Sequence, residues 1–302
     1  MHATFEAMSQ IYVNNALVNE DQAQVSVFDS GFVLGDGVWE GIRVHRGAPV
    51  FLKPHLDRLF EAAKALMIDV GRTPTEVQQA IEQTIAANGL TSDAHLRLMV
   101  TRGVRKQPYQ DPRLAIGQAT MIIVPAQSPH DPQAAKRGLN LFTVHVRRGS
   151  PDVQDQKINS HSKFNCVSAC IQANQAGADE ALMLDREGFV ATCNSTHFFI
   201  IRGGEVWTSN GDYCLGGITR ANVIALCQTH GIPIHQKRFS LTEVYGADEA
   251  FVTGTLGGLT PVRQVDGRAM SHATMPGPIT EQLAIHYQAL MDADAAAYQS
   301  IT

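Results

Sequence analysis

Three strand-like runs follow one another between residues 180 and 209. They are EALMLD, HFFIIR and EVWTS, with turn residues at Arg186-Glu187-Gly188 and at Gly203-Gly204. Strands that follow one another without a helix between them are joined by turns and pair antiparallel. This part of the chain therefore cannot be a regularly alternating βαβ sheet, and we expect an α+β arrangement.

The remaining elements mix helices and strands in no regular order. A helix is expected from Pro74, because Thr73 can cap it, Glu76 completes a capping box and Asn88-Gly89 can end it. Further helices are expected at 56–67, 164–176 and 219–230 and from about residue 278. Further strands are expected at QIYVNNALV, GAPVFLK, HLRLMVT, ATMIIV, LNLFTVHV, IPIHQKRF and EAFVTG.

A proline-rich segment divides the chain. PAQSPHDPQ at 125–133 gathers three prolines in nine residues between two strand-like runs. At 302 residues the chain is long enough for two ordinary domains. We predict a small N-terminal α+β domain over 1–124, a linker over 125–138 and a large C-terminal domain over 139–302. The active site is expected in the crevice between the domains.

Composition narrows the function. The formal net charge of −5 at pH 7 comes without any run of like charges, so no binding to nucleic acid or to a membrane is expected. No segment reaches the roughly 18 apolar residues of a spanning helix, and the N-terminus has no leader pattern, so we expect a cytoplasmic protein. The five cysteines form no CxxC pair, and neither a disulfide framework nor a metal site is expected.

Two glycine-rich turns have the character of phosphate sites. LGGITR at 215–220 runs directly into a helix, whose first amides at Ile218 and Thr219 and whose dipole favour an anion. GTLGG at 254–258 follows a strand and forms a second backbone nest. Taken alone, LGGITR is better explained as an ordinary capped helix, and GTLGG is a weaker signal still.

Longer motifs give these turns a context. GDGVWEGIRVHRG, FLKPHLDRLFEAAKAL, GADEALMLDREGFVATCNSTHFFI, LGGITRANVI and EAFVTGTLGGLTPV occur in this order between residues 35 and 262. In order and spacing the chain resembles the class IV aminotransferases, the group of branched-chain, D-amino-acid and (R)-amine transaminases. This resemblance implies the two-domain class IV fold and the cofactor pyridoxal 5′-phosphate (PLP), bound in the interdomain crevice.

The resemblance also implies roles for individual residues. The cofactor phosphate would be bound by Arg58, Ile218, Thr219, Gly254 and Thr255, and the pyridine ring would pack on Leu215, with Thr192, Asn194, Ser195 and Gly217 as further cofactor-binding positions. The substrate wall would comprise Val38, Trp39, Arg43, Arg97 and Leu256. Arg97 could instead be a surface residue of a strand. His161 and His197 are expected to pack or to hydrogen-bond rather than to act as acid-base groups.

The chain departs from the family pattern at two positions. Thr192 stands where the family places a glutamate against the pyridine nitrogen, and Asn159 stands where an ungapped match places the Schiff-base lysine. Lys163 lies four residues further on, where relatives often carry a side chain that faces the cofactor's phenolic oxygen. Lys157 would serve if two residues were inserted before the helix. We favour Lys163 as the catalytic lysine and keep Lys157 as the alternative.

The predicted function is PLP-dependent transamination between an amino donor, either an amino acid or an (R)-amine, and a 2-oxo acid acceptor. The EGIR motif favours branched-chain L-amino acids, whereas the two departures leave D-amino acids and (R)-amines open. A homodimer is expected. The alternatives are a PLP-dependent lyase resembling aminodeoxychorismate lyase and a PLP-binding protein that no longer catalyses.

Overall fold

The chain divides into two compact units in the computed structural model, which describes residues 9–127 and 136–300. Unit 1 comprises the described residues up to 127 together with 159–162 and 292–300, and unit 2 comprises 136–158 and 163–291. Two short segments beyond residue 139 thus belong to unit 1. Of the linker predicted at 125–138, residues 128–135 lie outside the described residues.

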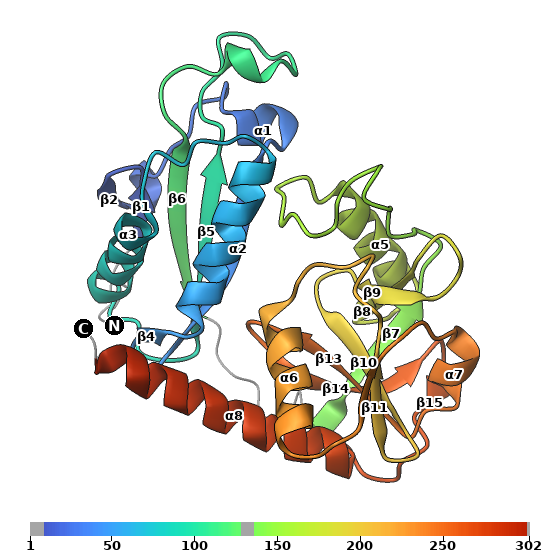
Figure 1. The fold of residues 1–302 in the computed structure, drawn as a ribbon. Coiled ribbons are helices and arrows are strands. Elements are labelled where there is room, and N and C mark those ends of the chain that lie inside the picture. Colours follow the sequence, from blue (N-terminus) through green and yellow to red (C-terminus); the bar gives the residue numbers. More distant parts are fainter. Residues whose placement is uncertain (1–8, 128–135, 301–302) are drawn as a thin grey trace, which may run out of the picture. The chain divides into compact units, whose positions relative to one another are not determined.

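Unit 1 is built on an antiparallel sheet with the strand order β2-β1-β6-β5-β3-β4 (Figure 1). The strands are β1 (Gln10–Val13), β2 (Ala16–Asn19), β3 (Gly37–His45), β4 (Ala48–Pro49), β5 (Ala94–Thr101) and β6 (Thr120–Gln127). Helix α2 (Leu52–Ala65) packs against β3, and α3 (Pro74–Ala87) packs against β1 and β6. A short helix, α1 (Ser30–Leu34), and the 3-10 turns Glu20–Gln22 and Pro112–Leu114 complete the unit.

The two long helices of unit 1 were both predicted, and the start of α3 matches its sequence signal. The predicted capping box of α3 is confirmed, because Thr73 accepts from the Glu76 amide and the Glu76 carboxylate accepts from the Thr73 amide. Helix α2 begins at Leu52, four residues before the predicted start at Leu56. Pro54 does not prevent this earlier start, because an amide in the first turn needs no partner within the helix.

The single strand predicted for QIYVNNALV was wrong. β1 and β2 form a hairpin in which Val13 pairs with Ala16, so Asn14 and Asn15 make a two-residue turn. Asn14 has a φ of 58°, a left-handed conformation that asparagine tolerates better than most residues. Its amide also donates to the Met121 carbonyl at 2.7 Å, which ties the turn to the neighbouring strand.

Unit 2 contains a mixed sheet with the order β12-β11-β10-β13-β14-β7-β8-β9, to which β15 adds beside β14. Its strands are β7 (Leu139–Thr143), β8 (Glu180–Leu184), β9 (Val190–Cys193), β10 (His197–Arg202), β11 (Glu205–Thr208), β12 (Ile234–Gln236), β13 (Glu249–Gly254), β14 (Gly258–Val265) and β15 (Arg268–Ala269). The predicted antiparallel pairing is confirmed for β10 with β11. β7 and β8, separated by α5 (Phe164–Gln175), pair in parallel, as do β11 and β12, separated by α6 (Ile218–Thr229).

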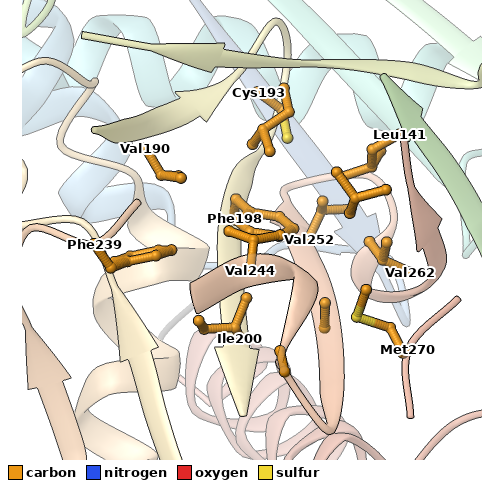
Figure 2. Packing of buried hydrophobic residues seen from close by; sticks show 14 of the residues in the cluster. Leu141, Val190, Cys193, Phe198, Ile200, Phe239, Val244, Val252, Val262 and Met270 are labelled. Atoms are coloured by element: carbon orange, nitrogen blue, oxygen red, sulfur yellow. The ribbon is translucent and has the colours of Figure 1, made fainter. Parts of the chain in front are cut away.

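The main core of unit 2 lies against this sheet. Phe198 and Ile200 of β10 contact Val252 of β13, and Val244 of helix α7 (Leu241–Tyr245) closes over them (Figure 2). These side chains come from strands at the centre of the sheet, so the central strands are fixed by packing as well as by hydrogen bonds. The α+β class expected from the sequence is confirmed. No helix in the described ranges is long and apolar enough to cross a bilayer.

Glu249 is a buried carboxylate at the start of helix α8 (Pro278–Gln299). Its two oxygens accept from the amides of Ile279 and Thr280 at 3.1 and 2.9 Å. A Cβ on Gly277 would lie 2.2 Å from Cδ of Glu249, so only glycine fits at that position. The carboxylate therefore satisfies the first amides of α8 and lies at the positive end of the helix dipole.

We expect Glu249→Ala to lower the free energy of unfolding by about 2 kcal/mol, because two amides at a helix N-terminus lose their acceptor. Glu249→Gln retains one acceptor and should cost less. The matched control is Glu281→Ala, which removes an exposed carboxylate from the first turn of the same helix. Chemical denaturation followed by circular dichroism measures the three losses, and equal losses for both alanine variants would contradict the capping role.

Candidate active site

Three turns of unit 2 meet at one end of strands β10 and β13. The first turn (192–197) joins β9 to β10, the second (215–219) leads into α6, and the third (254–258) joins β13 to β14. We call this group the three-turn site. β10 and β13 pair antiparallel with His197 opposite Thr253, and this register places the start of one strand beside the end of the other.

His197 connects the first turn to the second. Its Nε2 lies 2.8 Å from the carbonyl oxygen of Leu215, and a Cβ on Gly217 would lie 2.3 Å from Cε1 of the same ring. Only glycine therefore fits at 217, and the imidazole holds the LGG backbone from one side. The expected packing and hydrogen-bonding role of His197 is confirmed, and His161 is held similarly in unit 1, with Nε2 3.1 Å from the Val38 carbonyl oxygen.

The N-terminus of α6 has no side-chain cap. The helix begins at Ile218, and its N-cap Gly217 has no side chain that could accept from the first amides. The first turn of α6 also carries no acidic residue. The amides of Ile218 and Thr219 lie at the positive end of the helix dipole, and the first turn has no acidic side chain that could take the place of a bound anion.

The third turn packs against the first. A Cβ on Gly254 would lie 3.4 Å from Cγ2 of Thr196, which is ordinary van der Waals contact. Gly254 pairs with Gly258, whose φ of 59° is left-handed, and residues 255–257 form the turn between them. Leu256 at its tip is exposed. The sequence-predicted positions Gly254, Thr255 and Leu256 therefore lie beside the first turn.

A buried carboxylate closes the first turn, but it does not come from residue 192. The hydroxyl of buried Thr192 donates to the Thr196 carbonyl oxygen at 2.7 Å. Oε1 of Glu180 accepts from the Ser195 amide at 3.1 Å and from the Ser195 hydroxyl at 2.8 Å, and the Thr196 hydroxyl lies 3.0 Å from both carboxylate oxygens. Burial raises the pKa of Glu180, while the hydrogen bonds from Ser195 and Thr196 act in the opposite direction.

Positive charge lies beside this turn. Arg148 donates from Nη2 to the Cys193 carbonyl at 2.8 Å and from Nη1 to Oε1 of Gln156 at 2.9 Å. Its Nε is buried without a hydrogen-bond partner among the described residues. The side-chain amide oxygen of Asn194 accepts from the Ala181 amide at 2.8 Å and so holds the turn to β8. Among all the residues that the structure describes, no group of three or more His, Cys, Asp or Glu side chains could hold a metal ion.

The two candidate lysines lie in different local environments of unit 2. Nζ of Lys157 donates to the carbonyl oxygen of Gly211. A Cβ on Gly211 would lie 3.8 Å from this Nζ and 3.7 Å from Nη2 of buried Arg220, so two cationic groups flank that glycine. Lys163 is the N-cap residue of α5, and this helix packs against β8, the strand that carries Glu180.

In unit 1, residues 159–162 run beside β3. The amide of Trp39 donates to the Asn159 carbonyl at 2.9 Å, and Nδ2 of Asn159 donates back to the Trp39 carbonyl at 2.7 Å. The Arg97 guanidinium lies over the Trp39 indole, with Cζ 3.8 Å from the ring centroid. Val38 is fully buried, and Arg43 lies 3.8 Å from Asp93. The structure thus brings Trp39, Arg97 and Asn159 together.

Arg58 forms an ion pair with a buried glutamate of unit 1. Its Nε and Nη2 donate to the two oxygens of Glu40 at 2.8 and 2.6 Å, and Nδ1 of His55 lies 2.7 Å from Oε2. Burial by itself raises the pKa of Glu40, but the hydrogen bonds and charges of His55 and Arg58 outweigh it and hold the pKa below 4.5. The bidentate pair fixes the plane of the guanidinium.

Residues 37–265 match the sequence pattern of the family described as Amino-transferase class IV. The chain belongs to the class IV aminotransferases. This family membership confirms the resemblance that the motifs indicated. It also identifies the chain as a member of an enzyme family.

Individual class IV aminotransferases are similar to nearly the whole chain. A putative branched-chain-amino-acid aminotransferase of Methanocaldococcus jannaschii is 40% identical over 275 residues, which is 91% of this chain and 93% of that protein. The branched-chain-amino-acid aminotransferase-like protein 2 of Arabidopsis thaliana is 38% identical over 93% of this chain, and the chain spans only 50% of that relative's length. The T.th. branched-chain amino acid aminotransferase, solved with pyridoxamine 5′-phosphate, superposes with a TM-score of 0.89 at 30% identity and 95% coverage of each chain. The class IV fold expected from the sequence is confirmed.

Several residues of the site were not found from the sequence. Glu40, His55 and Glu180 carry no local signal, because their partners are 15 or more residues away in the chain. The pairing of Arg58 with Glu40 was missed as well. For Glu180 the available clue was a carboxylate in the otherwise apolar strand EALML, since a buried carboxylate requires a cation or several donors.

We expect Glu40→Gln to lower the free energy of unfolding by about 3 kcal/mol at neutral pH, because it leaves the Arg58 guanidinium without its buried counter-charge. The depressed pKa of Glu40 means that its contribution is present above pH 4.5 and is lost as the pH falls through the lower folded-state value. The variant should therefore lose less stability on acidification than the parent. Thermal unfolding at several pH values measures this, with Glu61→Gln on the exposed side of α2 as control. Parallel pH profiles of Glu40→Gln and the parent would contradict the assignment.

Proposed function

We propose that this class IV aminotransferase transfers an amino group between an amino acid or (R)-amine donor and a 2-oxo acid acceptor, with PLP as cofactor. The three-turn site carries the proposal. Within one unit it combines a helix N-terminus without a side-chain cap, a glycine-rich turn after β13 and a turn held by His197. A phosphate dianion suits the amides of Ile218 and Thr219 and the nest at residues 254–255.

When bound, PLP supplies an electrophilic aldehyde and an electron-withdrawing ring. The chain would bind its phosphate through the second and third turns and through Arg58, whose guanidinium is already oriented by Glu40. Leu215, whose carbonyl oxygen His197 holds, would pack against the ring. Gly217, Asn194 and Ser195 would complete the binding site from the turns that carry them.

Lys163 is the proposed catalytic lysine, whose Nζ would bond the cofactor and move the proton at the substrate α-carbon. Its position at the start of α5 supports this role, because α5 packs on β8 and β8 closes the first turn through Glu180. Lys157 already donates to the Gly211 carbonyl beside Arg220. Asn159 offers an amide rather than an amine, and that amide is engaged with Trp39.

Thr192 would face the pyridine nitrogen in place of a carboxylate. Its one hydroxyl proton is donated to Thr196, so toward the ring its oxygen can only accept. A neutral acceptor stabilises a protonated nitrogen less than a carboxylate does, and the charge of nearby Arg148 opposes protonation further. The chain would therefore use PLP as a weaker electron sink than a relative with a glutamate at this position.

The substrate wall is proposed to include Trp39 and Arg97, whose stacked side chains combine an apolar surface with a cation. Val38, Arg43 and Leu256 are further proposed wall residues. We also propose that the protein is a cytoplasmic homodimer and that branched-chain amino acids are its first candidates as donors. The named relatives are aminotransferases, and no observation favours a lyase.

Borohydride reduction of the PLP-loaded protein, followed by peptide mapping, should place the phosphopyridoxyl label on Lys163. Lys163→Ala should abolish both label and turnover, whereas Lys157→Ala should retain a measurable share of both. The physical reason is that only an amine within bonding reach of the aldehyde carbon can be trapped by the reductant.

The other outcomes of this experiment separate the alternatives. A label on Lys157 would reverse the lysine assignment. No label on either lysine, with no spectral response of the bound cofactor to a panel of amino acids and (R)-amines, would indicate a PLP-binding protein that does not catalyse. Release of pyruvate without a 2-oxo acid acceptor would indicate a lyase.

Arg58→Ala should weaken PLP binding roughly 10- to 150-fold, because a charge-assisted contact to a phosphate dianion contributes about 1.5 to 3 kcal/mol. Fluorescence titration of the cofactor-free protein with PLP measures the change. Arg72→Ala, at an arginine of the same unit that contacts Asn14 and Asn15, is the control. An unchanged affinity in Arg58→Ala would remove this residue from the phosphate site.

A further inference from the structure

Asparagine is followed directly by glycine at two places in the chain, 88–89 and 210–211. Glycine has no side chain to shield its amide nitrogen, so this nitrogen can approach the side-chain carbonyl carbon of the preceding asparagine closely. The attack is intramolecular and is therefore favoured by proximity. In a folded chain its rate depends on how firmly the asparagine side chain and the glycine amide are held.

The pair at 88–89 is held firmly. Nδ2 of Asn88, the C-cap of α3, donates to the carbonyl oxygens of Gln10 and Thr84, both at 2.8 Å. Oδ1 of Asn88 accepts from the Gln10 amide at 2.8 Å. The Gly89 amide donates to the Ala86 carbonyl at 3.2 Å. The carbon that would be attacked and the nitrogen that would attack are thus both restrained by hydrogen bonds.

The pair at 210–211 is held much less. Asn210 is exposed and lies in the segment between β11 and α6. Its Nδ2 donates to Oδ2 of Asp212 at 2.5 Å, and its Oδ1 accepts from the Asp212 amide at 3.3 Å, so its side chain bonds to one neighbour two residues away. In the ranges that the structure describes, no residue accepts from the Gly211 amide. The attacking nitrogen is therefore not engaged.

Two cationic side chains lie beside Gly211. Nζ of Lys157 donates to its carbonyl oxygen. Nη2 and Nη1 of Arg220 lie 3.7 and 3.8 Å from the position that a Cβ on Gly211 would take. A nearby positive charge stabilises the negative charge that develops on the Gly211 nitrogen when its proton leaves. The surroundings of this pair therefore promote the attack, whereas the surroundings of the other pair oppose it.

We propose that Asn210 is a site of spontaneous deamidation, promoted by the cations beside Gly211. The Gly211 nitrogen gives its proton to water and attacks Cγ of Asn210. The new C–N bond closes a succinimide ring, while the bond from Cγ to Nδ2 breaks and ammonia leaves with a proton taken from water. Water then opens the ring at Cγ to give aspartate, or at the main-chain carbonyl to give isoaspartate. Water is the only co-reactant.

Either product changes the segment that leads into the three-turn site. Ser209, just before Asn210, is held at its carbonyl oxygen by Nη2 of Arg220 at 2.7 Å, and the Leu215 carbonyl oxygen is held by His197. Both products place a new carboxylate between these fixed points, and isoaspartate also lengthens the main chain there. The isoaspartate form should therefore displace the LGG turn and weaken binding of the PLP phosphate. This consequence rests on the proposed function, whereas the deamidation does not.

Mass spectrometric peptide mapping of the folded protein, sampled during incubation at neutral pH, measures the replacement of the side-chain NH2 by OH at each pair. Asn210 should lose its amide at least about 10-fold faster than Asn88, because the pair at 88–89 must first break its hydrogen bonds. In the chain unfolded in urea the two rates should become similar. This comparison uses one chain and needs no variant.

Lys157→Met tests the contribution of the cations. It should slow the loss of the Asn210 amide about 5-fold, the effect of one unit charge at about 4 Å in water, and should leave Asn88 unchanged. Lys53→Met, the same change at an exposed lysine of α2, is the matched control and should alter neither rate. Equal rates at the two pairs in the folded protein, an Asn210 that keeps its amide, or a rate that Lys157→Met leaves unchanged would overturn the proposal.

PLP titration of the incubated protein measures the consequence separately. The isoaspartate form should bind PLP at least about 10-fold more weakly than fresh protein, which corresponds to the loss of about one contact to the phosphate. Asn210→Ser cannot form the succinimide and should keep its affinity during incubation. Equal PLP affinity of the fresh protein and the isoaspartate form would overturn the effect on the three-turn site. Fresh protein that binds no PLP would overturn the proposed function, and the mass measurement would still decide whether Asn210 deamidates.

Discussion

The close approach of the His197 ring to Gly217 is the contact on which the arrangement of the three-turn site depends. No side chain fits between them, since a Cβ on Gly217 would lie 2.3 Å from the ring. His197 is the first residue of β10, and Gly217 is the N-cap of α6. Their contact therefore fixes the start of the strand relative to the start of the helix. The pairing of β10 with β13 then brings Gly254 to the same place. A phosphate-binding surface made of backbone amides needs this rigidity, because amides cannot adjust as flexible side chains do.

Two buried glutamates show how their neighbours determine what a carboxylate contributes. Glu40 meets an arginine and a histidine, so the charges and hydrogen bonds outweigh burial and its pKa is lowered. Among the described residues Glu180 accepts from hydroxyls and amides of Ser195 and Thr196, so burial prevails and its pKa is raised. The first arrangement orients the guanidinium of Arg58. The second closes the turn of residues 192–197 through the hydroxyls of Ser195 and Thr196.

The sequence predicted those helices and turns whose signals lie within a few residues of one another in the chain. The capping box of α3 and the start of α6 after LGG depend on neighbours three or four positions away, and both were predicted within one residue. The Asn14-Asn15 hairpin was missed, because its turn lacks the glycine that usually indicates one. LGGITR and GTLGG predicted two turns of the site, because the glycines that mark these turns lie within the motifs themselves. The roles of His197 and Glu180 depend on contacts with Leu215 and Ser195 across a fold that no short window of sequence contains.

The segment around Asn159 shows why the lysine could not be assigned from spacing alone. Residues 159–162 belong to unit 1, where Asn159 makes two hydrogen bonds with Trp39, while the residues on either side belong to unit 2. The chain changes unit twice between residues 158 and 163, and Asn159 anchors the part in unit 1. Counting residues along the sequence therefore does not say whether Lys157 or Lys163 can reach a cofactor. Lys157 precedes the segment 159–162, and its Nζ donates to the Gly211 carbonyl oxygen. Lys163 is the first residue after that segment and is the N-cap of α5. The two hydrogen bonds with Trp39 fix Asn159 in unit 1, and its side chain offers an amide rather than an amine. Lys163 therefore stays the proposed catalytic lysine, with Lys157 as the alternative.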